Sequence, residues 1–132
     1  MKVTKWNTRV LQTPADNPLV VGIDQPGTRE FVTLELDTDE GLQGIGVTFF
    51  GGQLTPALRT AVDNLSELIV GEDPLQVEAV TDKLRLAAGS SGPEGIFTLA
   101  ISAIDIALWD IKGKALNQSV CSLLGGHRDR AI

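Results

Sequence analysis

The sequence predicts an α+β domain in which a three-stranded antiparallel meander is followed by a bundle of three to four helices. Two observations carry this prediction. Apolar residues alternate in the first part of the chain, as in half-buried strands, and recur every three to four residues in the second part, as in amphipathic helices. Strands that precede the helices, rather than alternate with them, are typical of α+β domains.

Turn-forming residues mark where the strands begin and end. Residues 3–13 mix apolar and polar positions and are expected to form the first strand. Residues 14–29 are rich in Asp, Asn, Pro and Gly and are expected to form a loop of about 15 residues, which is long for a compact domain. Residues 30–37 and 42–48 are predicted to form a hairpin around the turn at 38–41, which ends in glycine.

The first two helices are predicted from apolar spacing and from capping residues. The first runs from Leu54 to Gly71, and its apolar stripe consists of Leu58, Ala61, Val62, Leu65, Leu68 and Ile69. Asp73 is expected to cap the second helix, with Pro74 at the first helical position, where its missing N–H costs nothing. Glycines in residues 89–95 interrupt the helical pattern.

The third helix is predicted to begin at Ile96 and to be buried on most sides. One face carries Phe97, Ile101, Ile104, Leu108 and Ile111, and much of the rest carries Leu99, Ala103, Ile106 and Trp109. Residues 119–124 are expected to form a short last turn that ends at Gly125 and Gly126.

The composition excludes several classes of function. With 17 acidic and 11 basic residues the formal charge is -6, so a surface for nucleic acid is not expected. No apolar run approaches the roughly 20 residues that span a bilayer, and residues 1–8 are too polar for a secretory leader, so we expect a cytoplasmic protein without a membrane segment. Cys121 is the single cysteine, which excludes an internal disulfide, and we expect a buried thiol.

Residue types that carry out catalysis or bind metals are scarce. His127 has no second His, Glu or Cys at metal-binding spacing and is expected to be an ordinary surface histidine. Gly41, Gly44 and Gly46 are not expected to form a phosphate loop, because they are not part of a glycine motif that leads directly into a helix. The residues therefore indicate no catalytic residue and no metal site in this chain.

Two acidic residues in the third helix need partners, because a carboxylate among apolar neighbours is costly. Asp110 has Lys114 one turn later, in an orientation that favours an ion pair. Asp105 has no cation at the neighbouring helical positions, so we expect a tertiary partner, either an Arg or Lys elsewhere or backbone amides. We expect Asp105, Trp109 and Asp110 to have structural rather than catalytic roles.

Two segments that follow strands are candidates for binding, residues 14–29 and residues 47–52. The second places Phe49 and Phe50 next to two glycines. These two aromatic side chains could pack into the core or remain exposed for a ligand, and the residues do not decide between the two.

Several motifs resemble the N-terminal capping domain of the mandelate racemase and muconate lactonizing enzymes of the enolase superfamily. They are the three-strand opening, E-L-D-T-D-E-G-L-Q-G-I-G at 35–46, Gly-Glu-Asp-Pro at 71–74 and A-I-D-I-A-L-W-D-I-K-G-K at 103–114, of which the last is the specific one. The resemblance covers essentially the whole chain. It implies a capping domain at 1–126 and a connector at 127–132 toward a (β/α) barrel of about 250 residues, for which 132 residues have no room.

The resemblance also implies where substrate is contacted. In such enzymes the cap lies over the mouth of the barrel, and two cap loops contact the substrate and exclude water. The loop residues carried over are Leu19, Val21, Ile23, Val47, Thr48, Phe49 and Phe50. The catalytic base and the three acidic ligands of Mg²⁺ belong to the barrel, so no bound metal is expected on this chain. Lys112 and Lys114 lie in a cap helix and are not expected to be the family's catalytic lysines.

The function implied is that of a substrate-specificity domain, inactive alone, of a Mg²⁺-dependent enzyme that abstracts the proton α to a carboxylate. Residues 88–95 are most similar to acid-sugar dehydratases, and a racemase, epimerase or cycloisomerase is the alternative parent. The expected partners are the barrel, a small carboxylate substrate of the parent and further copies in a homo-oligomer. A freestanding α+β module that binds another protein is the alternative from a different class.

Overall fold

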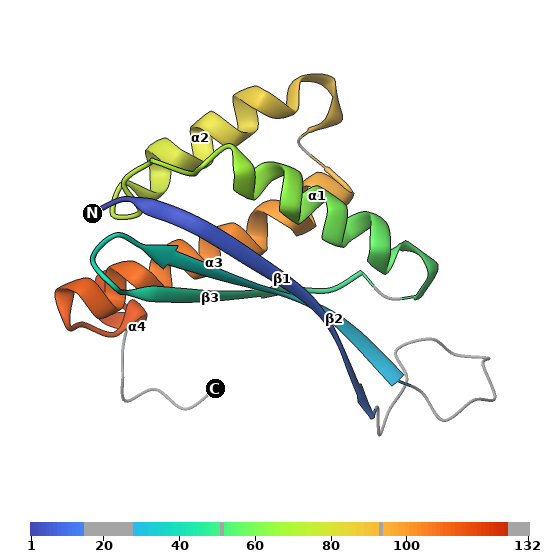
Figure 1. The fold of residues 1–132 in the computed structure, drawn as a ribbon, viewed down its shortest axis with the longest axis horizontal. Helices are drawn as coiled ribbons and strands as arrows, with labels where there is room; N and C mark the ends of the chain where they lie inside the picture. Colours follow the sequence, from blue (N-terminus) through green and yellow to red (C-terminus); the bar gives the residue numbers. More distant parts are fainter. Residues whose placement is uncertain (15–27, 51, 93, 127–132) are drawn as a thin grey trace.

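The computed structural model describes residues 1–14, 28–50, 52–92 and 94–126. The first part of the chain forms an antiparallel sheet of three strands in the order β1-β2-β3, and the helices follow it (Figure 1). The strands are β1 (Val3–Pro14), β2 (Thr28–Thr38) and β3 (Gln43–Thr48). The predicted meander is confirmed.

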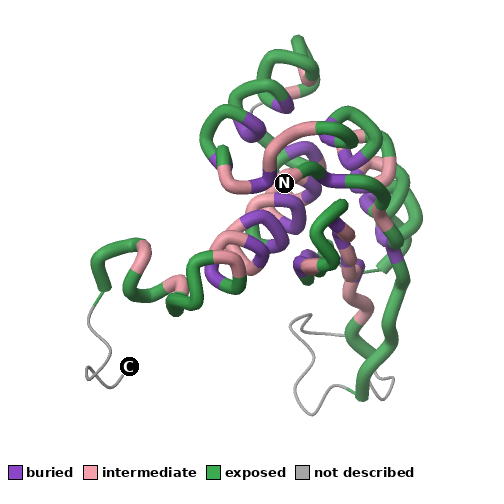
Figure 2. Tube along the Cα trace, turned by 60° about the vertical axis from the view of Figure 1, so that its left-hand side comes forward, coloured by how far each residue is buried: buried purple, intermediate pink, exposed green. Residues whose placement is uncertain are grey.

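The helices cover one face of this sheet. They are α1 (Thr55–Glu67), α2 (Val77–Ala88), α3 (Ile96–Leu116) and α4 (Val120–Leu123), with 3-10 turns η1 (Gly52–Leu54) and η2 (Gly89–Ser91). α3 lies along β3, α1 packs on β1, and α2 packs on α3. Figure 2 shows the buried positions on the sides of these elements that face one another. Among the helices of the described residues, none is both long and apolar enough to cross a membrane.

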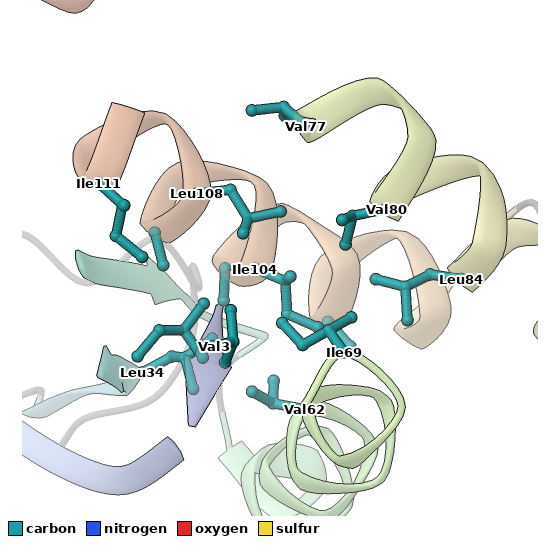
Figure 3. Packing of buried hydrophobic residues seen from close by; sticks show 14 of the residues in the cluster. Val3, Leu34, Val62, Ile69, Val77, Val80, Leu84, Ile104, Leu108 and Ile111 are labelled. Atoms are coloured by element: carbon teal, nitrogen blue, oxygen red, sulfur yellow. The ribbon is translucent and has the colours of Figure 1, made fainter. Parts of the chain in front are cut away.

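The core lies between the sheet and the helices, with α3 at its centre. Alternate residues of β2, namely Val32, Leu34 and Leu36, are fully buried, as the period-two pattern predicts. Ile104 of α3 lies among Leu34 of β2, Val62 of α1 and Val80 of α2 (Figure 3). One helix thus connects all the other layers, which explains why its sequence is apolar on most sides.

Two glycines let α3 approach β3 very closely. A Cβ atom at Gly46 would overlap the carbonyl oxygen of Ala103, and one at Gly44 would overlap the carbonyl oxygen of Ala107. The small residues on both elements bring the helix backbone against the strand. This contact explains the G-I-G sequence that resembled part of a phosphate loop.

Helix α1 is joined to β1 through one carboxylate. Oδ1 of Asp63 accepts hydrogen bonds from Nε1 of Trp6 at 3.1 Å and from the hydroxyl of Thr8 at 2.7 Å. Arg59, one turn earlier on α1, donates to the same Thr8 hydroxyl at 3.2 Å. These half-buried bonds hold the helix over the edge strand in one position.

Among the described residues, no helix covers the other face of the sheet. Two cross-strand ion pairs cover part of it, Lys5 with Asp37 at 3.2 Å and Arg9 with Glu35 at 3.5 Å. Ile45 of β3 also points to this side and is half exposed. The strands β1 and β2 continue beyond the end of β3 as a two-stranded ribbon (Figure 1).

Three local predictions were wrong. Asp73 does not cap α2, because its side chain accepts from the backbone N–H of Leu75 in a turn and the helix begins three residues after Pro74, at Val77. Leu68 does not belong to the buried apolar stripe: it follows the end of α1 at Glu67 and is 40% exposed. Ile106 is likewise exposed, although α3 as a whole is largely covered.

Candidate functional site

A hollow forms where β3 ends beside the first turns of α3. Its volume is about 430 Å³, and the described residues that line it are Val47, Thr48, Phe49, Phe50, Leu99 and Ser102. The structure therefore brings together the four predicted residues of the second loop and adds two from α3. Leu19, Val21 and Ile23, the residues predicted for the first loop, lie outside the described residues.

The lining residues differ in exposure because they lie at the end of a strand. Thr48 is the last residue of β3 and faces the helices, so its side chain is buried. Phe49 is 48% exposed and Phe50 is 42% exposed, which places both aromatic rings outside the core. The ring of Phe49 packs edge-on against Phe31 of β2, with 5.8 Å between the ring centroids.

Two of the residues that line the hollow, Thr48 and Ser102, carry hydroxyl groups. The hydroxyl of Ser102 donates to the carbonyl oxygen of Leu99 at 2.7 Å and lies 3.4 Å from the hydroxyl of Thr48. None of the six lining residues is charged. Within the described residues, no group of three His, Cys, Asp or Glu side chains could hold a metal ion. The hollow can therefore contact a ligand and exclude water, but its lining supplies no acid, base or metal ligand.

Asp110 and Lys114 hold β3 from the side. The predicted ion pair between them is present, with 2.7 Å between Oδ2 of Asp110 and Nζ of Lys114. The same Oδ2 accepts from the backbone N–H of Ile45 at 2.9 Å, and Nζ donates to the carbonyl oxygen of Gln43 at 2.7 Å. The pair therefore makes two tertiary bonds to the strand that leads to the hollow.

Asp105 is a partly covered residue of α3, and its carboxylate is influenced by Glu78 and Arg85 of α2. Burial, followed by the negative charge of Glu78, raises the pKa of this carboxyl above its usual 3.8, while Arg85 and a hydrogen bond from Trp109 oppose the shift. A direct ion pair, one of the two kinds of partner expected, is not found, since no Lys or Arg nitrogen of the described residues lies within 4.0 Å of the carboxylate. The structural role of Asp105 and Trp109 stays a prediction.

The raised pKa makes Asp105 an unfavourable charge at neutral pH. A raised folded-state pKa means that its contribution to stability is full below about pH 3.8 and is lost as the pH rises through the folded pKa. We therefore expect Asp105→Asn to be more stable than the native chain at pH 7, with a difference that disappears below pH 3.8. Urea unfolding of both proteins across this range measures it. A difference that stays constant with pH would contradict the prediction.

Two further sequence expectations have definite outcomes. Cys121 is exposed rather than buried, because α4 is a single turn with no buried residue. His127 lies outside the described residues.

The sequence analysis did not identify Ser102 as a lining residue. It is the one hydroxyl-bearing residue in the mostly apolar segment at 99–108, and it could have been singled out for that reason.

Comparison with known proteins gives consistent similarities. Residues 5–125 match the N-terminal domain of mandelate racemase / muconate lactonizing enzyme. The chain is 37% identical to D-galactarolactone cycloisomerase of Agrobacterium fabrum over 128 residues, covering 96% of this chain and 32% of the relative. It is 34% identical to L-talarate/galactarate dehydratase of Salmonella typhimurium over 124 residues, covering 90% of this chain and 30% of the relative.

A solved structure shows the same fold. L-talarate dehydratase from Polaromonas sp. JS666, in complex with Mg and L-glucarate, matches with a TM-score of 0.85 and 30% identity. The match covers 97% of this chain and 36% of that one. The chain thus spans about a third of the length of the relatives that it matches.

Proposed function

Because the chain belongs to the mandelate racemase / muconate lactonizing enzyme family and matches the N-terminal domain of that family, we propose that it caps the catalytic domain of a larger enzyme and helps to select the substrate. The hollow at the end of β3 is the observation that carries the proposal. Its exposed aromatic rings are costly to leave in water, and its lining has no group that transfers protons. Such a surface suits a wall that closes over a ligand held elsewhere.

The proposed reaction of the parent is dehydration of a sugar acid after removal of the proton α to its carboxylate. The support is the similarity to dehydratases, one of which was solved with Mg and L-glucarate. The described residues do not fit a magnesium site, because they offer no cluster of acidic ligands. We therefore assign the metal and the catalytic base to the part of the parent beyond this domain. The boundary at residue 126, the homo-oligomer and the cytoplasmic location stay predictions.

A cycloisomerase is the second candidate. The similarity to D-galactarolactone cycloisomerase covers nearly the whole chain, at an identity close to that of the dehydratases. Since one proton abstraction can lead to either outcome, groups outside this domain would decide between them.

The first test is to read the coding DNA beyond Ile132. A reading frame that continues into a barrel with a lysine base and three acidic ligands supports the proposal. A stop codon directly after Ile132 contradicts it and leaves the protein-interaction module as the working hypothesis.

The second test measures the role of the hollow in the full-length enzyme on a panel of sugar acids and lactones. We expect Phe49→Ala to lower kcat/KM on the best substrate about 10- to 100-fold, the effect of losing one buried aromatic contact. Leu86→Ala is the matched control, because Leu86 lies on α2 and is 84% exposed. Equal kcat/KM values for Phe49→Ala and the native enzyme on every substrate would contradict the assignment.

A further inference from the structure

Strand β3 is an edge strand of the sheet that the described residues form, since the strand order is β1-β2-β3. The backbone groups that point outward from an edge strand are free to pair with a strand of another molecule. On β3 the outward backbone N–H and C=O groups belong to alternate residues. Two of these groups are already hydrogen-bonded to side chains of α3. Asp110 accepts from the N–H of Ile45, and Lys114 donates to the carbonyl oxygen of Gln43.

We infer that Asp110 and Lys114 close this edge of the sheet to a further strand, and that the strand they exclude is β3 of a second copy. A strand that paired with β3 would need the N–H of Ile45 and the carbonyl of Gln43 as its partners. Both already make charge-assisted bonds of 2.9 and 2.7 Å. The ion pair of 2.7 Å between the two side chains holds both in place over the edge.

The sequence of β3 makes such closure necessary. The strand Q-G-I-G-V-T has no charged residue and no proline, which are common devices against edge pairing. Ile45 and Val47, whose side chains lie on the sheet face away from the helices, are 50% and 42% exposed. Both are β-branched residues that favour strands. An uncharged edge strand with exposed β-branched side chains is a site where another strand can pair when its edge is open.

A second copy of β3 is the occupant that the charges favour. Two such strands side by side bring together no like charges, because neither carries any. The opposite edge is protected differently. The start of β1 is already paired, with bonds from the N–H of Val3 to Glu72 and from the N–H of Gly71 to Val3, and its exposed side chains include Lys5 and Arg9.

The inference is tested on the full chain with the double variant Asp110→Ala/Lys114→Ala. We expect the amide of Ile45 to exchange about 10- to 100-fold faster than in the native chain at low concentration, because it loses a charged acceptor. At high concentration we expect the variant to gain mass as a dimer by light scattering, with renewed protection of the Ile45 amide. Protection at this residue distinguishes edge pairing from association through Phe49 and Phe50.

The matched control is Asp82→Ala/Arg85→Ala, which removes an ion pair of 3.2 Å on α2, away from any strand. It is expected to behave as the native chain in both measurements. If the double variant at the β3 edge does not fold by circular dichroism, Lys114→Met carries the test, since it frees only the carbonyl of Gln43. A folded variant that keeps the native mass at every concentration, or native exchange at Ile45, overturns the inference.

Discussion

Replacing Gly46 with alanine is expected to lower the free energy of unfolding by at least about 3 kcal/mol. The new Cβ would overlap the backbone carbonyl of Ala103, so relief requires α3 to move away from β3. Since α3 also forms the centre of the core, that movement loosens its contacts with β2, α1 and α2. Urea unfolding followed by circular dichroism measures the loss, which is a large part of the 5–15 kcal/mol typical of a domain.

Two comparisons separate this steric effect from other consequences of losing a glycine. Gly41→Ala is expected to cost only about 1–2 kcal/mol, because its backbone has a positive φ of 79° but no atom lies within 4 Å of the added Cβ. Ala103→Gly is not expected to rescue Gly46→Ala, because the overlap is with the main chain of residue 103. Rescue by that second change would show that the contact has been misassigned.

Truncating Ile104 to alanine is expected to cost about 2–5 kcal/mol. Ile104 is fully buried where the sheet meets three helices, so the cavity has neighbours from several elements and no simple way to collapse (Figure 3). The same unfolding measurement applies, and the loss should appear without a change in the slope against urea.

The controls for Ile104→Ala come from the same helix. Ile104→Val removes one methylene group and is expected to cost about 0.5–1.5 kcal/mol. Ile106→Ala, two residues further on, is expected to change stability by less than about 0.5 kcal/mol, because Ile106 is 43% exposed. Equal losses at residues 104 and 106 would contradict the assigned orientation of α3.

The sequence predicted the fold well wherever side-chain periodicity has one interpretation. The buried face of β2, most of the apolar stripe of α1 and the start of α3 follow from spacing alone. The start of α2 did not, because Asp73 forms the same type of hydrogen bond in an isolated turn as at a helix N-terminus. Nor did the sequence show that Cys121 is exposed, because the spacing of apolar residues does not determine how much of a short helix is packed against the rest of the chain.

The candidate site was predictable in part. Phe49 and Phe50 were identified by their place at a strand end, but their exposure depends on where α3 crosses β3, a tertiary relation. That crossing also explains Ser102, which joins the hollow only because Gly44 and Gly46 bring the helix close. The bonds from Asp110 and Lys114 to β3 join residues more than sixty positions apart, beyond any local pattern.

The order of the elements along the chain has a consequence during synthesis. The apolar face of β2 is translated long before α3, the helix that covers it. Sixty-eight residues separate Thr48 from Leu116, and at about 5–20 residues per second the ribosome needs roughly 3–14 s to make them. Throughout that interval the nascent strands have neither their core helix nor the carboxylate and ammonium groups that protect β3. Whatever keeps the emerging chain from misassembly must therefore act before α3 exists.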